Sequence, residues 1–118
     1  MEEYTLGMVE SKFADIVWEH APLTTAELIK LCEKELGWKR TTTYTVLKKF
    51  KNRGIFENRR STVVALMTKQ EFYGRQSESY VDRSFQGSLS GFLAAFTSRR
   101  KLSDEEIKRL QQIIDENR

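Results

Sequence analysis

The segment 39–50 carries hydroxyl and cationic side chains at spacings that suit contact with DNA. If the segment is helical, its inner face holds Thr43, Val46, Leu47 and Phe50, and its outer face holds Thr41, Thr42, Tyr44, Thr45 and Lys48. β-Branched threonines suit a solvated helix poorly, because they lose rotamer freedom there. In a DNA groove, hydroxyls bond to phosphates or base edges and threonine methyl groups contact the thymine methyl.

The charge distribution also indicates a polyanion site. Residues 39–60 contain eight basic side chains against one acidic side chain, Glu57, whereas residues 1–38 contain three basic and eight acidic ones. Such a run also occurs on ordinary solvated helix faces, so the charge alone leaves both interpretations open. The residues that we expect to contact DNA are Lys39, Arg40, Thr41, Thr42, Tyr44, Thr45, Lys48, Lys49, Arg59 and Arg60.

The remaining reactive side chains do not form a catalytic or metal-binding pattern. The single histidine, His20, is placed at a predicted helix end, and the single cysteine, Cys32, is placed on an apolar helix face. The chain has no nucleophile motif, glycine-rich phosphate loop or metal-ligand spacing, so we expect no enzyme activity, metal or cofactor. It also has no signal peptide or long apolar run, which predicts a cytoplasmic protein without membrane insertion.

Capping residues mark where three of the predicted helices begin. Three capping boxes pair Thr24 with Glu27, Thr68 with Glu71 and Ser103 with Glu106. Apolar periodicity then predicts a first helix that ends near residue 20. Further helices are predicted over 24–36, 41–53, 68–86, 88–98 and 103–117. Two short strands, 55–58 and 62–66, flank a turn at 59–61. Three helices and a hairpin are the order of a winged helix-turn-helix, whose third helix enters the major groove.

The predicted fold is therefore mostly α, with a winged-helix DNA-binding domain at 1–67 and a helical dimerisation domain at 68–118. The C-terminal helices carry apolar stripes that short helices must cover by tertiary contacts. A second copy of the chain would cover them, although the tail could instead fold back on its own winged helix. The residues expected at the dimer interface are Phe72, Tyr80, Leu89, Phe92, Leu93, Phe96, Ile107, Leu110, Ile113 and Ile114.

The sequence resembles the penicillinase-repressor family (BlaI/MecI type, related to the CopY repressors) over nearly its whole length. The matches are Glu10, Trp18, Trp38, the pattern Thr42-x-x-Thr45-x-Leu47-x-Lys49-Phe50-x-x-Arg53-Gly54, and Leu102-Ser103-x-Glu105-Glu106-Ile107-x-x-Leu110. The resemblance implies a transcriptional repressor that binds a palindromic promoter operator in double-stranded DNA as a homodimer. It further implies control of a β-lactam or other stress-response gene, with Thr41, Thr42, Tyr44 and Thr45 as recognition residues.

The resemblance also implies a partner and a mode of induction, and the sequence departs from the family in places. Penicillinase repressors are inactivated through a membrane sensor-protease, and the cleaved Asn-Phe bond aligns with Ala95-Phe96 here. The chain thus keeps the phenylalanine without the asparagine. It has Ser11 and Ala65 where the family commonly has tryptophan and tyrosine, and it lacks the Cys-x-Cys motifs of the copper branch. The alternative function is a winged-helix protein-interaction module without sequence-specific DNA binding.

Overall fold

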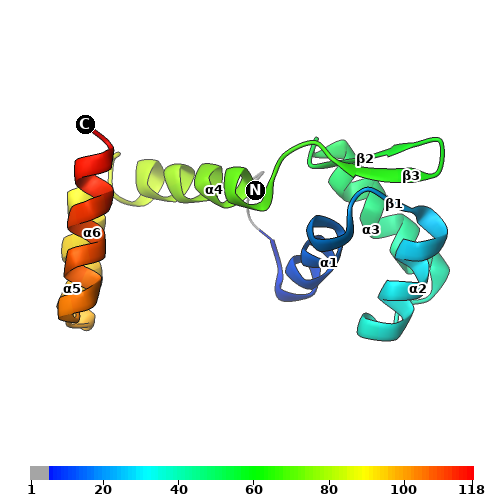
Figure 1. The fold of residues 1–118 in the computed structure, drawn as a ribbon, viewed down its shortest axis with the longest axis horizontal. Coiled ribbons are helices and arrows are strands. Elements are labelled where there is room, and N and C mark those ends of the chain that lie inside the picture. Colours follow the sequence, from blue (N-terminus) through cyan, green and yellow to red (C-terminus); the bar gives the residue numbers. More distant parts are fainter. Residues whose placement is uncertain (1–5) are drawn as a thin grey trace. The chain divides into compact units, whose positions relative to one another are not determined.

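The computed structural model describes residues 6–118 (Figure 1). In this range the elements are α1 (Met8–His20), β1 (Leu23–Thr24), α2 (Thr25–Leu36), α3 (Arg40–Asn52), β2 (Phe56–Arg59), β3 (Thr62–Ala65), α4 (Lys69–Ser84), α5 (Leu89–Arg99) and α6 (Asp104–Glu116). The expected fold class is confirmed: a winged helix-turn-helix is followed by helices. None of the helices in the described range is long and apolar enough to cross a membrane.

The predicted caps set the starts of three helices. At α2 the Thr24 hydroxyl accepts the Glu27 N–H (3.1 Å) while the Glu27 carboxylate accepts the Thr24 N–H (2.9 Å). Thr68 and Glu71 form the same reciprocal pair at α4. The backbone N–H and hydroxyl partners lower the pKa of both glutamates below the ordinary value. The Ser103 hydroxyl accepts a backbone N–H in the first turn of α6.

The wing is part of a three-stranded antiparallel sheet in the order β1-β3-β2. The short strand β1 was not predicted; Leu23 pairs with Val63 of β3. The hairpin turn is also tighter than expected, because Arg59 pairs with Thr62 and leaves two residues in the turn. These residues have φ angles of 51° and 64°, as a type I′ turn requires.

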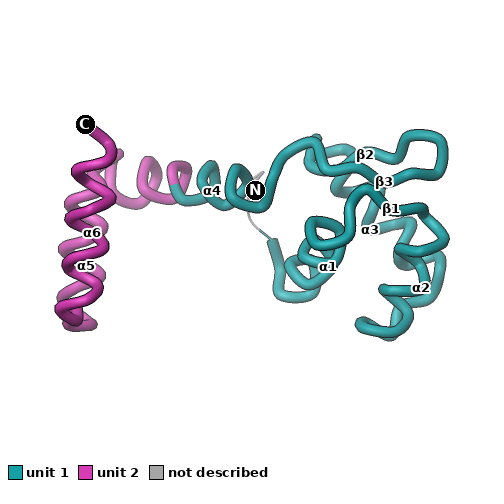
Figure 2. The backbone as a smooth tube through the Cα atoms, viewed as in Figure 1, with its two compact units in different colours: residues 1–77 teal, residues 78–118 magenta. Residues whose placement is uncertain are grey.

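Within the described part of the chain, residues 6–77 form one compact unit with its own core (Figure 2). Three phenylalanines from α1, α3 and β2 meet at its centre: Phe50 lies 5.2 Å from Phe13 and 5.1 Å from Phe56, measured between ring centroids. The buried hydrophobic residues are Phe13, Ala14, Ile16, Val17, Leu23, Leu28, Cys32, Leu47, Phe50, Ile55, Phe56, Val63 and Phe72. The helix-turn-helix and the wing therefore pack on the same hydrophobic core.

Residues 78–118 form the second unit, so the boundary falls within α4 rather than at residue 67. The reason is Phe72, which is fully buried in the core of the first unit and packs 5.6 Å from Trp18. Phe72 was expected at the dimer interface. Its burial within the single chain removes it from any surface that a partner could contact.

The second unit differs from the first because none of residues 78–118 is buried in the single chain. Its aromatic side chains pack edge to face: Phe92 lies 6.1 Å from Tyr80 and 5.6 Å from Phe85. Large apolar side chains remain in contact with solvent, including Leu89 at 68% and Ile114 at 58% exposure. These helices thus form a unit without a closed core.

Candidate nucleic-acid interface

Helix α3 has the two faces that its sequence predicts. Thr43, Leu47 and Phe50 are buried against the core, and Val46 is partly buried beside them. The Thr43 hydroxyl lies next to the Cys32 thiol of α2. Burial raises the pKa of this thiol, and the neighbouring hydroxyl offsets part of that rise. The buried face fixes the rotation of α3, so the residues of the opposite face must point outward.

The outward face of α3 carries hydroxyl groups near the start of the helix. Thr41, Thr42, Tyr44 and Thr45 are all exposed. The Thr45 hydroxyl donates to the Thr41 carbonyl at 2.9 Å. This hydrogen bond favours one rotamer of the Thr45 side chain. The Arg40 guanidinium lies 5.8 Å from the centroid of the Tyr44 ring, within the range of a cation–π contact. These contacts restrict the side chains of Thr45 and Tyr44.

The electrostatics of α3 are uniformly positive. The helix contains no acidic residue from Arg40 to Asn52. Four cationic side chains at or near this helix are exposed: Lys39, Arg40, Lys48 and Lys49. A helix that carries cations and no carboxylate of its own attracts polyanions.

The wing arginines occupy different environments. Arg59 forms an ion pair with Glu57 on the same strand, so part of its charge is already compensated. Arg60 lies in the turn itself and is exposed. Sequence analysis had treated the two arginines alike. The structure makes Arg60 the better candidate for a phosphate contact at the tip of the wing.

Two cavities flank α3 and add polar residues that sequence reasoning missed. Both include Tyr44. The first, about 230 Å³, is lined by Thr25, Ala26, Ile29, Lys30, Arg40 and Tyr44. The second, about 310 Å³, is lined by Tyr44, Leu47, Lys48, Lys51, Asn52 and Asn58. Lys30, Lys51 and Asn58 thus lie beside the outer face of α3. Of these three, sequence analysis had included only Lys51, as one of the basic residues counted in 39–60.

Asn58 differs from the other residues of this interface. Its side-chain oxygen is buried and has no hydrogen-bond partner among the described residues. A buried polar atom without a partner costs about 1–3 kcal/mol, so such an atom is normally satisfied by water or a ligand. Asn58 lies on β2 and lines the second cavity.

The remaining predicted site residues lie in the second unit. Nine residues expected at the dimer interface are exposed or partly buried there: Tyr80, Leu89, Phe92, Leu93, Phe96, Ile107, Leu110, Ile113 and Ile114. Ala95 and Phe96, the aligned cleavage position, are exposed within α5. Within residues 6–118, no cluster of three or more His, Cys, Asp or Glu side chains could hold a metal ion.

Comparison with known proteins gives consistent matches over nearly the whole chain. The model of the penicillinase repressor family matches residues 6–116. The penicillinase repressor of Bacillus licheniformis is 26% identical over 113 residues, covering 92% of this chain and 88% of the relative. The methicillin resistance regulatory protein MecI of Staphylococcus aureus is 17% identical over 116 residues, covering 95% and 94%. The matched region includes most of both compact units.

Proposed function

The chain belongs to the penicillinase-repressor family, a family of transcriptional repressors, and from this premise we propose that it binds operator DNA through α3 and the wing as a homodimer. The observation that carries the DNA contact is the outer face of α3. It combines exposed hydroxyl groups and lysines with the absence of any acidic residue, while its inner face is locked into the core. A protein-docking helix would instead need an exposed apolar or acidic face.

The two kinds of side chain on this face have different tasks. The hydroxyl groups of Thr41, Thr42 and Thr45 lie in the first turns of α3, the part of a recognition helix that contacts base edges. Lys48 and Lys49 follow on the next turns, where their ammonium groups can reach phosphates. Phosphate contacts position the protein on DNA, and base contacts select the sequence.

The homodimer is supported by the second unit. A unit in which none of residues 78–118 is buried does not gain enough from burial to offset the loss of conformational entropy. Pairing with an identical unit would cover the exposed apolar side chains of α5 and α6. A two-fold dimer would present two recognition helices, so we expect a palindromic operator.

The test of DNA binding is a salt titration. With fluorescence anisotropy on promoter DNA, Lys49→Ala should weaken binding to all sequences alike and lower the slope of log affinity against log salt by about one unit per protomer. Lys34→Ala, which removes an exposed lysine from α2, is the matched control and should change neither. If Lys49→Ala altered sequence preference at an unchanged slope, the lysine would not act on a phosphate.

The test of the dimer is sedimentation. Ile114→Asp places a charge in the exposed apolar stripe of α6 and should shift the protein to monomer at micromolar concentration. Gln112→Asp adds the same charge on the same helix outside the stripe and should leave the dimer intact. A wild-type chain that sediments as a monomer at this concentration would contradict the proposal.

For the mode of induction, we propose that cleavage at Ala95-Phe96 would require part of α5 to open first. The two residues lie inside the helix, and the Phe96 carbonyl accepts the backbone N–H of Arg100 at 3.2 Å. Cleavage within a helix depends on local opening, because a folded turn offers a protease little access. Pulse proteolysis in the presence and absence of DNA would show whether this bond is cut at all.

A further inference from the structure

The second cavity beside α3 is bounded by the wing strand β2 as well as by the helix. The core sets the position of β2 against α3, because the rings of Phe56 and Phe50 stack there with their centroids 5.1 Å apart. Asn58 follows Phe56 by two residues, so both side chains lie on the face of β2 that is turned toward α3. We call this cavity of about 310 Å³ the α3–β2 notch; it is lined by Tyr44, Leu47, Lys48, Lys51, Asn52 and Asn58.

The charged lining of the notch is entirely cationic. Its two charged residues, Lys48 and Lys51, lie three residues apart and therefore on neighbouring positions of the helix surface. Neither lysine forms an ion pair within residues 6–118. The carboxylate next to Asn58 along β2 belongs to Glu57, which does not line the notch and is paired with Arg59. Two cations without a counterion at one cavity favour an anionic ligand.

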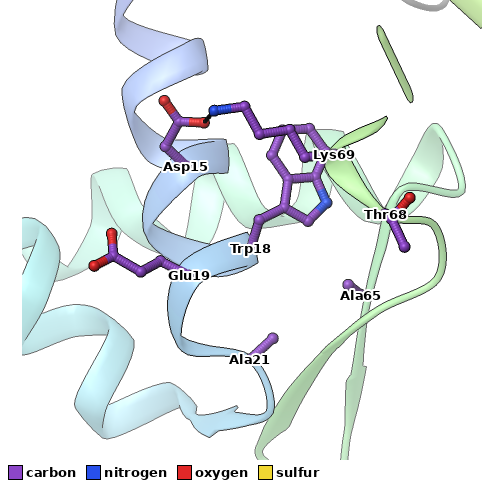
Figure 3. Close-up of a pocket in the computed structure, with 7 residues that line it drawn as sticks. All are labelled: Asp15, Trp18, Glu19, Ala21, Ala65, Thr68 and Lys69. Carbon is purple, nitrogen blue, oxygen red and sulfur yellow. Dashed lines mark ion pairs between the residues drawn. The ribbon is translucent and has the colours of Figure 1, made fainter. Parts of the chain in front are cut away.

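The cavity between α1, β3 and α4 shows the opposite case (Figure 3). It has a volume of about 530 Å³ and contains one lysine, Lys69, whose Nζ lies 2.9 Å from an Asp15 oxygen. Glu19 adds a second carboxylate to its lining. The charge of Lys69 is thus compensated within the chain, and this cavity gives no reason to expect an anion. The notch differs because its lysines lack such a partner.

Asn58 adds hydrogen-bond donors to the notch. The oxygen of its carboxamide is buried and has no hydrogen-bond partner among the described residues. Because this end of the amide is covered, its NH₂ group is the end that can donate toward the cavity that Asn58 lines. Phosphate oxygens in protein–DNA complexes accept hydrogen bonds from lysine and asparagine side chains, and the notch offers both.

We propose that the notch binds one phosphodiester of the DNA backbone, held by Lys48 and Lys51 and positioned by the amide of Asn58. The inference rests on the proposed contact of α3 with DNA. It adds Lys51 and gives the strand β2, as well as the turn of the wing, a share in binding. A phosphate that contacts both elements would fix the angle of α3 on the DNA, because α3 and β2 are joined through Phe50 and Phe56 in one core.

Neutral methylphosphonate linkages test the assignment one phosphate at a time. A duplex that the unchanged chain selects from random DNA is synthesised with a single such linkage at each position of one half-site, and the affinity of the full chain is measured by fluorescence anisotropy. The linkage at the notch should weaken binding by the unchanged chain about five- to tenfold near 0.1 M salt, the effect of one lost ionic contact. Lys51→Gln should weaken binding to natural DNA by a similar factor for each half-site.

The decisive observation is the coupling between the variant and the linkage. In Lys51→Gln, the linkage at the notch should cost nothing further, because the contact is already lost, while the other linkages keep their effects. Lys34→Gln removes an exposed lysine of α2 outside the notch and is the matched control. It should bind natural DNA like the unchanged chain and lose affinity in full at the same linkage.

Asn58→Asp tests the strand side of the notch with almost no change in side-chain volume. The new carboxylate should weaken binding to natural DNA at least as much as Lys51→Gln does. The methylphosphonate at the notch should recover most of this loss, because the carboxylate then faces a neutral group. A loss caused by damage to the fold would not be recovered by a change in the DNA.

The outcomes separate this inference from the proposed function. If the unchanged chain binds DNA but no linkage loses its effect in Lys51→Gln, or if no linkage rescues Asn58→Asp, the notch does not hold a phosphate and the proposed function stands. If the unchanged chain binds no duplex at all, the proposed function is wrong and the assignment of the notch is overturned with it.

Discussion

Replacing Phe72 by alanine tests where the first unit ends, because this side chain lies early in α4 and is fully buried within the single chain. Truncation of a buried phenylalanine costs about 3–5 kcal/mol, from lost transfer energy and from the cavity left behind. The ring also packs 5.6 Å from Trp18 and 5.2 Å from Tyr73. Such aromatic pairs add about 0.5–1.5 kcal/mol each, so we expect a loss near the upper end, about 4–5 kcal/mol.

Urea unfolding followed by tryptophan fluorescence measures this loss selectively. Both tryptophans, Trp18 and Trp38, belong to the first unit, so their fluorescence does not report directly on the second. A domain is stable by about 5–15 kcal/mol, and Phe72→Ala should therefore remove a large share of the total. Phe72→Leu, with a smaller loss of about 1–2 kcal/mol, gives a measurable value if the alanine variant does not fold.

The matched control is Phe96→Ala in the second unit, where the side chain is 41% exposed. We expect it to weaken the dimer and to leave the fluorescence midpoint nearly unchanged. If Phe72→Ala dissociated the dimer while the first unit unfolded at the same urea concentration as before, Phe72 would belong to the dimer surface and the reasoning would fail.

Three further predictions concern the wing, a helix cap and the operator. Ser61→Gly should raise the free energy of unfolding by up to about 1 kcal/mol in urea unfolding, because Ser61 has a φ of 64°, which glycine adopts without strain; an unchanged midpoint would argue against strain in the turn. Thr24→Ala should cost about 1 kcal/mol of stability and raise the pKa of Glu27 toward 4.5 in an NMR titration. The stability that Glu27 adds in the unchanged chain is present above about pH 4.5 and is lost as the pH falls through its lower folded value. Finally, inserting half a helical turn between two intact operator half-sites should abolish tight binding in a mobility-shift assay, whereas a full turn should be tolerated better; equal affinity at every spacing would exclude a fixed dimer on DNA.

Much of the fold could be predicted because local signals set it. Thr24, Thr68 and Ser103 mark helix starts by hydrogen bonds within the next three residues, so no distant contact is needed to find them. The short strand at Leu23 could not be found in this way. Two residues show no periodicity, and the strand exists only because the chain pairs it with Val63.

The candidate site was predictable on α3 and less so around it. The two faces of α3 follow from helical periodicity, whereas Asn58 and Lys30 reach the site only through the packing of other elements. Phe72 was misassigned for a related reason: an apolar stripe indicates that a face is buried and does not identify what covers it. The ion pair that compensates Arg59 likewise depends on Glu57 of the same strand, a pairing that charge counting overlooked.

The lack of buried side chains in residues 78–118 has a consequence for dosage. On the proposed dimer, folding of this unit and association of two chains are one equilibrium, so its stability rises with the number of copies in the cell. Well below the dissociation constant, halving the number of chains lowers the number of dimers about fourfold by mass action. The first unit, with its own core, would stay folded throughout. Repression would then change more than linearly with the amount of protein, even without an inducer.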